Sequence, residues 1–374
     1  MYKQLDIEIK GVKARTTKQA IIIASEHPLK VLSSAVLNGG LVYASSIINY
    51  HVQKNFRNSN PTAYLRRATS KLALSDPTVG LMTAARLKNV SIKKNQDEEI
   101  ATIVTAGVSY PAAAGDEIEV GNTHQGTINT ILIINRNLTD SAMVEAVKTA
   151  TEAKALTLAD LDIRSRFSNQ AASGTTTDSI CVACTGKGKR RDYAGTGTPI
   201  GQGIARTTRE AVEEAILREN GISRNRPLLS RLNERGIEMR TLVETGMELF
   251  CATPSTISKQ RATALLRRGL TSSLSDVNIA SLIIAGIRLD EEGRAGAIPK
   301  LRAEAFMADP INLVADETIG IAIANYIGGT LGVHNFLYYD RMKPGITKQL
   351  SPFMDDAICG LVAGVMSKVL REEG

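Results

Sequence analysis

The sequence has little of several residues that mark particular protein classes. Its 374 residues contain no tryptophan and only four cysteines, and aromatic residues make up 4%. Four cysteines could form too few disulfides to cross-link a chain of this size. A disulfide scaffold is therefore excluded, and reduced thiols are expected. Few aromatic rings are available to stack on nucleic-acid bases, so no nucleic-acid partner is predicted.

The charged residues bear on the kind of partner that the protein could bind. The net charge of +7 favours anionic partners such as a membrane surface or a phosphorylated small molecule. The one dense basic run, Lys187-Gly-Lys-Arg-Arg191, has no interleaved aromatics and is typical of a solvated loop. No basic and then apolar leader opens the sequence, so a cytoplasmic protein is expected.

Two long uncharged stretches, 31–50 and 318–339, could be mistaken for membrane helices. Each reaches the roughly 20 residues that a spanning helix needs. Both contain asparagines and a glycine pair, Gly39-Gly40 and Gly328-Gly329, which are unfavourable in hydrocarbon. No membrane span is predicted.

The length favours two domains, because single cores tend to split beyond about 250–300 residues. The clearest boundary lies at 218–227, where a helical pattern ends in Asn220-Gly221 and Pro227 prevents continuation. We place it at residue 222. Alternating strand and helix patterns predict an α/β or α+β domain with a mixed sheet over 1–222, and helical periodicity predicts an all-α domain over 223–374.

Individual elements follow from the same patterns. In the first domain we expect a hairpin of 19–24 and 31–36, buried strands at 100–105, 127–134 and 179–183, and helices at 61–74, 140–158 and 200–217. In the second domain we expect helices at 228–235, 239–250, 256–267, 275–285, 316–326 and 356–370.

Acidic residues stand among apolar ones near the end of the chain. They form the doublets Asp316-Glu317 and Asp355-Asp356, with Asp340 close to Lys343. Such carboxylates, with the amides of Asn325 and Asn335, are the hard oxygen ligands that Mg²⁺ prefers, and a lysine suits a substrate phosphate. An aspartate at a helix start is also an ordinary cap, but only one member of a doublet can cap.

In the first half, five short stretches contain small hydroxyl or amide residues, and four of the five also contain glycine. The stretches are Asn38-Gly39-Gly40, Thr105-Ala-Gly107-Val, Gly126-Thr-Ile-Asn129, Thr151-Glu152-Ala-Lys154 and Gly174-Thr-Thr176-Thr-Asp178. Such loops let backbone N–H groups approach a ligand. The threonine run ending in Asp178 offers nucleophiles or oxyanion donors beside a carboxylate, as acyl chemistry needs, although a plain turn explains it too. The glycine-rich segment 195–203 is either a loop or an anion cradle at a helix start.

One cysteine pair, Cys181 and Cys184, falls within a predicted buried strand. At this spacing the thiols point to opposite or skewed faces, and no histidines stand at ligand spacing. Core cysteines are therefore expected, rather than a zinc site.

From 232 to 368 the chain resembles the soluble branch of the phosphatidylglycerophosphatase A family. The resemblance rests on 233–237 (Asn-Glu-Arg-Gly-Ile), 316–325, 332–336, 339–346 and 353–356. It departs at Arg267-Arg268-Gly269-Leu270, where relatives usually show Lys-Arg-Glu-Val. It implies an all-helical, Mg²⁺-dependent phosphomonoesterase.

From 31 to 217 the chain resembles the adenosylcobinamide amidohydrolase family. The resemblance rests on the five stretches quoted above together with Val79-Gly-Leu-Met-Thr83-Ala-Ala. The family cleaves the amide between aminopropanol and the corrin side chain, releasing adenosylcobyric acid. No established catalytic residue is carried over from it, and no cofactor is implied.

The order of the halves resembles the archaeal bifunctional adenosylcobinamide hydrolases and alpha-ribazole phosphatases. That resemblance implies a cobamide salvage enzyme with two small-molecule substrates. Homo-oligomerisation stays open. The alternative is a Mg²⁺-dependent lipid phosphatase fused to a non-catalytic corrinoid-binding domain.

These expectations assign roles to particular residues. In the second domain Asp316, Glu317, Asp355 and Asp356 are expected to hold Mg²⁺, Asp340 to aid the attacking water, Lys343 and Asn335 to neutralise the phosphate, and Asn325 to bind substrate. In the first domain Thr176 and Asp178 are expected near the scissile amide, Asn38 and Asn129 as polarising donors, and Gly39, Gly40, Glu152 and Lys154 as substrate contacts.

Overall fold

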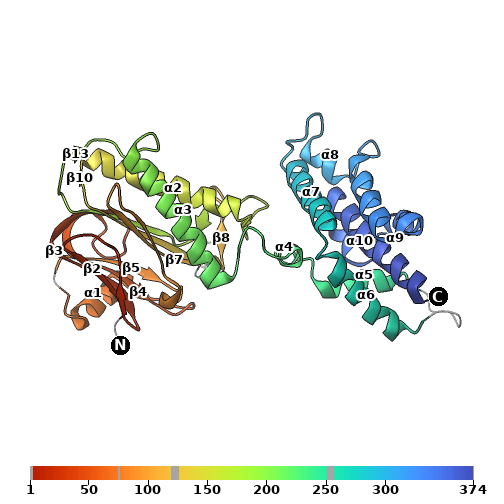
Figure 1. The fold of residues 1–374 in the computed structure, drawn as a ribbon, viewed down its shortest axis with the longest axis horizontal. Helices are drawn as coiled ribbons and strands as arrows, with labels where there is room; N and C mark the ends of the chain where they lie inside the picture. The colour runs from red at the N-terminus through yellow and green to blue at the C-terminus, as the bar shows by residue number, and fades with distance from the viewer. Residues whose placement is uncertain (1–2, 75, 119–125, 251–256, 374) are drawn as a thin grey trace. The chain divides into compact units, whose positions relative to one another are not determined.

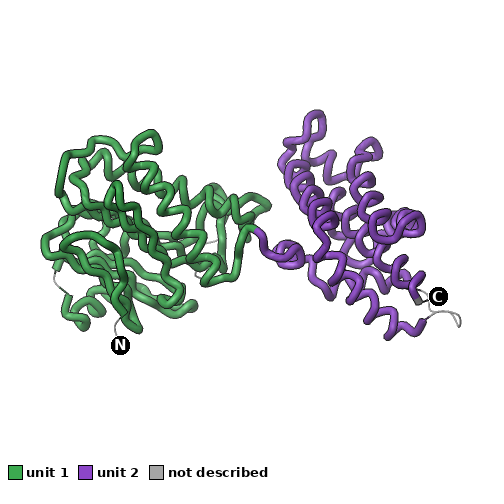
Figure 2. Tube along the Cα trace, in the orientation of Figure 1, with its two compact units in different colours: residues 1–224 green, residues 225–374 purple. Residues whose placement is uncertain are grey.

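The computed structural model describes all residues except 1–2, 75, 119–125, 251–256 and 374. The chain forms two compact units, Met1–Arg224 and Asn225–Gly374 (Figure 2). The first contains a mixed sheet with helices and the second is helical, as the sequence predicts (Figure 1). Within the described residues no individual helix is long and apolar enough to span a membrane. Helices α6 (Lys259–Ser273) and α7 (Val277–Arg294), bent by 83°, reach that length and composition jointly.

The first unit is built around a nine-stranded sheet. Its strands are β1 (Lys3–Leu5), β2 (Val12–Thr16), β3 (Ala20–Ser33), β4 (Gly40–His51), β5 (Thr78–Thr83), β6 (Ser91–Asn95), β7 (Ile100–Gly107), β9 (Thr127–Ile134) and β12 (Ser179–Cys184). Four two-residue strands complete the unit: β8 (Pro111–Ala112), β10 (Asn137–Leu138), β11 (Gly174–Thr175) and β13 (Arg190–Arg191). Its helices are α1 (Pro61–Lys71), α2 (Asp140–Asp160) and α3 (Pro199–Asn220).

The long strand β3 organises this sheet. One edge of β3 pairs with β4 along nearly its whole length, and the other edge pairs with β2 and then with β12. The predicted hairpin of 19–24 and 31–36 is therefore wrong, because both segments belong to β3. A register shift between Ala24 and Leu29 accommodates the exposed residues 26–28, and the true hairpin partner is β4.

The other expected elements of the first unit are present. Strands β7, β9 and β12 and helices α1, α2 and α3 include or overlap the predicted ranges. Every residue of β9 is buried, because apolar clusters cover both faces of the sheet there. Helices α2 and α3 lie side by side over one of these faces (Figure 1).

The second unit has seven helices within its described residues. They are α4 (Leu228–Asn233), α5 (Met239–Glu248), α6 (Lys259–Ser273), α7 (Val277–Arg294), α8 (Ala303–Met307), α9 (Ala315–Met342) and α10 (Pro352–Glu373). All six predicted helices occur, although the expected start at 256 lies outside the described residues. Helices α9 and α10 are longer than predicted, and α8 was not expected.

Helix α9 reverses direction at Gly329, whose φ of 64° and ψ of −153° are not helical. The contacts of its two arms show the reversal, since Gly320 faces the Phe336 ring and Gly332 faces the backbone of Ala324. Both arms pack on α10: Gly320 of the first arm lies against Gly360, and Gly332 of the second arm lies against Gly364. Because glycine has no side chain, the three helical segments can approach one another closely at these positions.

Gly360→Ala should destabilise the second unit by about 1–3 kcal/mol, because its methyl group would overlap the Gly320 carbonyl oxygen. Gly286→Ala in α7 is the matched control, since a Cβ there meets its neighbours at an ordinary 3.5 Å. That control should be neutral or stabilising by up to ~1 kcal/mol through helix propensity. Urea unfolding of both variants checks this, and equal stability would contradict the close packing.

Candidate active sites

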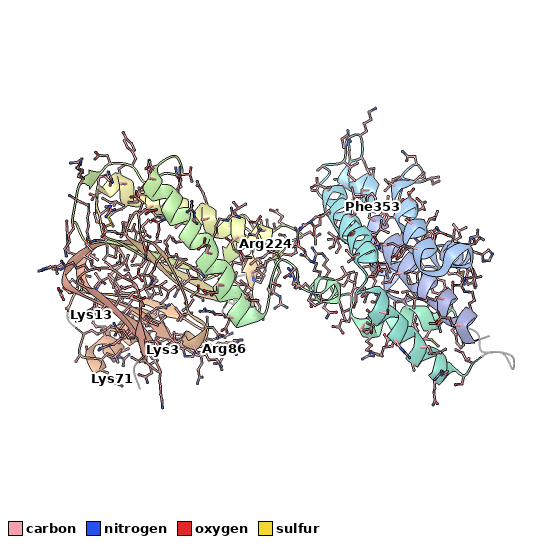
Figure 3. All side chains as sticks on the ribbon, viewed as in Figure 1. Lys3, Lys13, Lys71, Arg86, Arg224 and Phe353 are labelled. Carbon is pink, nitrogen blue, oxygen red and sulfur yellow. The ribbon has the colours of Figure 1, made fainter. Side chains whose placement is uncertain are left out.

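The reversal of α9 brings distant carboxylates together. Asp316 and Asp340 are equally far along the chain from Gly328, so the two arms place them at the same end of the helical hairpin. Helix α10 begins at this end and carries Asp355 in its first turn, with Asp356 directly after it. Phe353, buried and stacked on Phe306 with ring centroids 5.9 Å apart, anchors that turn within the unit (Figure 3).

Five carboxylates converge there as two overlapping groups. One group is Asp316, Glu317 and Asp356, and the other is Asp340, Asp355 and Asp356. Within each group, one oxygen from every residue lies within 4.8 Å of the others. Asp316, Asp355 and Asp356 are buried, and Asp356 belongs to both groups. We call these five residues the acidic cluster.

Lys343 is the cation at the acidic cluster. Its Nζ lies 2.7 Å from Asp340 Oδ1 and also contacts Asp355 Oδ2. Asp356 Oδ1 is 3.7 Å away and Asp309 Oδ2 is 4.0 Å away. Lys343, which the sequence analysis expects to neutralise a substrate phosphate, is engaged by carboxylates of the chain in this structure.

Burial disfavours the charged forms of the clustered carboxyls. It raises the pKa of Asp316 to about 7, with Glu317 adding to the effect, and that of Asp355 to about 6. Burial, followed by a hydrogen bond with Asp340, raises the pKa of Asp356 to about 9. Burial opposes the charge of Lys343, but hydrogen bonds to Asp340 and Asp355 outweigh it and raise the lysine pKa. Such a cluster favours a further cation.

Two predicted members do not join the cluster. Asn325 is exposed on the first arm of α9. Asn335 donates a hydrogen bond of 2.8 Å to Ser367 Oγ, three turns beyond Asp356 on α10. The expectation that Asn335 works beside Lys343 is therefore not met by the geometry.

The departure at Arg267-Arg268-Gly269-Leu270 has a packing reason. Helix α6 crosses α10 at Gly269, and a Cβ there would lie 2.5 Å from Val365 Cγ1. A glutamate at this position would require the two helices to separate. In this chain the segment brings helices together and adds no acid to the cluster.

In the first unit Asp178 is a hydrogen-bonding hub before β12. Its carboxylate accepts from the backbone N–H of Ile128 at 2.9 Å, from the N–H of Thr175 at 3.1 Å and from the Thr175 hydroxyl. Lys154 of α2 forms an ion pair with it at 2.5 Å, and both side chains are 15% exposed. Gly174 makes room, since a Cβ there would lie 2.5 Å from Asp178 Oδ2.

A cleft of about 470 Å³ opens beside this loop. Its polar lining includes Thr83, Thr127, Thr177 and Ser179, and Thr127 and Thr177 share a hydroxyl hydrogen bond of 2.7 Å. Lys154 and Asp178 line a different hollow of about 140 Å³. The predicted Thr176 lines neither, and its hydroxyl is buried with no hydrogen-bond partner in the structure.

Asn129 lies in β9, two residues beyond Thr127 and on the same face of the sheet. Its amide N–H groups donate to Asn49 Oδ1 at 2.9 Å and to the Met82 carbonyl at 2.7 Å. Its Oδ1 is buried without a partner. Asn129 therefore offers an acceptor here, where the sequence predicted a donor.

Sequence reasoning missed the partners of Asn129. Asn49 donates to Thr105 Oγ1 at 2.9 Å, and Thr105 donates to Thr83 at 3.3 Å. All of these side chains are buried at one end of the sheet. In the sequence, this network is indicated by polar residues within otherwise apolar strands. Such residues are costly to bury unless they are hydrogen-bonded.

The remaining predicted contacts lie away from the cleft. Asn38, Gly39 and Gly40 form the turn between β3 and β4, where Asn38 donates to the Thr78 carbonyl at 2.8 Å. Glu152 is exposed on α2. Nothing in this geometry brings these residues to the lining of the cleft.

Hydrogen bonds and burial describe two further segments that the sequence analysis singles out. The Glu145 carboxylate accepts from the N–H groups of Ala194 and Gly195, at 2.6 and 3.0 Å, and so fills the start of the 195–203 loop itself. Cys181 and Cys184 are buried in apolar clusters on opposite faces of the sheet, as expected. Burial raises both thiol pKa values, that of Cys184 to about 12, so neither thiol is a ready nucleophile.

Comparisons with known proteins agree with this division. The family model described as adenosylcobinamide amidohydrolase matches residues 5–224, and that described as phosphatidylglycerophosphatase A matches residues 239–371. An adenosylcobinamide amidohydrolase of Methanosarcina mazei is 29% identical over 49% of this chain and 88% of its own length. A protein of uncharacterised function from Methanocaldococcus jannaschii, MJ1330, is 44% identical over 34% of this chain and its entire length.

The two units and the two family matches define a hydrolase with an amidohydrolase domain and a phosphatase-family domain. The chain belongs to the adenosylcobinamide amidohydrolase family. The first compact unit ends at Arg224, two residues beyond the boundary predicted from the sequence.

Asp178→Asn should destabilise the first unit by about 2–4 kcal/mol, because it leaves the largely buried Lys154 ammonium without a carboxylate. Asp192→Asn is the control, since its ion pair with Arg190 is exposed and contributes at most ~0.5 kcal/mol. Urea unfolding, with hydrogen exchange of the β9 amides as the local probe, distinguishes them. Equal stability of the two variants would show that Asp178 is not a structural hub.

Proposed function

We propose that this chain is a bifunctional cobamide salvage hydrolase. The first unit would cleave adenosylcobinamide to adenosylcobyric acid and aminopropanol, and the second would remove the 5′-phosphate from alpha-ribazole phosphate. The observation that carries the proposal is the joining, in one chain, of an amidohydrolase-family domain with a phosphatase-family domain whose five carboxylates converge. Both products would serve assembly of the same cofactor.

The acidic cluster fits Mg²⁺. Its donors are all carboxylate oxygens, and two of them, Glu317 Oε2 and Asp356 Oδ1, are buried without a hydrogen-bond partner. Hard oxygen ligands of this kind suit Mg²⁺. Asp316, Glu317 and Asp356, which form one group, would hold the ion, which when bound would neutralise charge on the phosphate and its leaving oxygen. Asp355, also expected from the sequence to be a ligand, contacts Lys343 instead.

The remaining groups would act on the substrate and on water. Asp340, half-buried at the rim of the cluster, would accept a proton from the attacking water. Lys343 would contact a phosphate oxygen, which stabilises charge that grows in the transition state. Because Asn335 is held by Ser367, we do not assign it a role.

In the first unit the cleft beside residues 174–178 would bind the amide. The hydroxyls of Thr127 and Thr177, which line the cleft, would contact the amide. The fully buried Asn129 would act behind the lining by holding Asn49 and the Met82 carbonyl in place. The loop containing Thr176 and Asp178 would face the scissile bond. Asp178 would act mainly by fixing this loop to β9 through Ile128.

Asp356→Asn should reduce phosphate release by at least about a hundredfold while leaving adenosylcobinamide cleavage unchanged, because it removes the carboxylate common to both groups. Glu244→Gln, which alters an exposed pair with Arg240, is the control and should keep both activities. Normal phosphatase turnover by the Asp356 variant, with its fold verified by circular dichroism, would refute the assignment.

Mg²⁺ affinity should rise with pH, because Asp316 and Asp356, whose pKa values are raised to about 7 and about 9, must lose protons before they bind metal. Between pH 6.5 and 8.5 the dissociation constant should fall by about tenfold or more. Calorimetric titrations in buffers of different ionisation enthalpy would also detect released protons. A dissociation constant independent of pH would contradict the protonated state of the metal-free cluster.

Thr176→Val should abolish amide cleavage if the buried hydroxyl of Thr176 reacts, and should preserve stability, because that hydroxyl makes no hydrogen bond. Thr177→Val is the matched variant, since Thr177 lines the cleft and bonds to Thr127 and Gly126. Assay of adenosylcobinamide turnover assigns the reacting threonine. Full activity of the Thr176 variant removes it from the mechanism.

A second candidate function is supported by exposed apolar side chains on the helical unit. Ile311 is fully exposed, and Val277, Val314, Tyr326 and Tyr338 are each at least half exposed. Such residues suit contact with a lipid surface, which would fit a phosphatidylglycerophosphate-type substrate beside a non-catalytic corrinoid-binding domain. Vesicle co-sedimentation separates the candidates, since alpha-ribazole phosphate needs no membrane.

A further inference from the structure

Lys343 occupies a position where a helix end favours glycine. It follows α9 with φ 45° and ψ 60°, and its N–H donates to the Tyr339 carbonyl at 2.8 Å. A left-handed conformation is unfavourable for lysine and costs glycine little. A lysine kept in such a conformation points to a use for its side chain.

The Lys343 ammonium lies where a metal ion would lie in one of the two carboxylate groups. It is bonded to Asp340 and Asp355 and is 3.7 Å from Asp356, and these three residues are the second group. The group therefore already contains a positive charge supplied by the chain.

In the first group only the shared Asp356 lies near Lys343, at 3.7 Å, and the other two members have no such cation among the described residues. Across the part of the chain that the structure describes, no lysine, arginine or histidine forms an ion pair with Asp316 or Glu317. Glu317 Oε2 and Asp356 Oδ1 are buried without a hydrogen-bond partner, and the Asp356 side chain is only 4% exposed. These buried acceptors point to a ligand of positive charge.

We propose that the helical unit binds one divalent cation, on Asp316, Glu317 and Asp356, and that Lys343 fills the second group in place of a second ion. This inference rests on the proposed function for the assignment of the acidic cluster as a metal site. It goes further by fixing the number of ions and by giving Lys343 a reason for its position.

The positive charge of Lys343 would exclude a second divalent ion from the second group. Two-metal phosphoryl-transfer sites hold their ions about 3.5–4 Å apart across a shared carboxylate, which is the place that Asp356 occupies between the groups. A divalent ion entering the second group would face the ammonium at contact distance. An ammonium has three hydrogens, and with two directed at Asp340 and Asp355 the third can bind a phosphate oxygen, as a second metal would.

The test is the stoichiometry of Mn²⁺ binding to the full chain, measured by calorimetry and by electron paramagnetic resonance. The unaltered protein should bind one ion per chain. Lys343→Gly, which also suits the left-handed backbone, should bind two ions with a spin-coupled signal. Lys343→Arg keeps the positive charge and should bind one. Lys348→Asn is the control, because Lys348 pairs with Glu248 at the surface and its loss should change nothing.

Every outcome bears on the inference. One ion in the unaltered protein and two in Lys343→Gly support it. Two ions in the unaltered protein overturn it while leaving the acidic cluster a metal site. One ion in both proteins overturns the exclusion by Lys343. No binding at all would instead contradict the metal assignment of the proposed function.

Discussion

The close approach of α9 and α10 is the constraint on which the helical site depends. Five carboxylates from three chain segments repel one another, and only a rigid framework can hold them together. Backbone contacts at Gly320, Gly360 and Gly364 supply that framework. The reversal at Gly329 then sets the register, so that the two ends of α9 meet the start of α10.

In the first unit, hydrogen bonds and not close helix packing hold the site residues in place. There a continuous buried network of Asn49, Thr105, Thr83 and Asn129 stabilises polar groups at one end of the sheet, beside the cleft. The Asp178 hub fixes the neighbouring loop to β9 and α2. The residues of each arrangement all belong to one unit.

Local patterns predicted most elements, because helical and strand periodicity are properties of short segments. They failed at β3, since Glu26, His27 and Pro28 interrupt the apolar pattern while a bulge lets the strand continue. The acidic cluster could be anticipated from its doublets in apolar surroundings. The exclusion of Asn335 could not, because its distance from Asp356 depends on the register between α9 and α10.

The N-terminal site was less predictable than the acidic cluster, since neutral side chains can serve either structure or binding. Asn38 and Asn129 look alike in sequence, yet one ties down a turn and the other leaves an acceptor unpaired. Only the complete set of hydrogen bonds separates the two cases.

The most direct measurement compares Mg²⁺-dependent phosphate release from alpha-ribazole 5′-phosphate with release from phosphatidylglycerophosphate in vesicles, using the same purified chain. The account predicts strong preference for alpha-ribazole 5′-phosphate, which would join both domains to cobamide salvage. Preference for the lipid would contradict it and would make the helical unit a peripheral membrane enzyme.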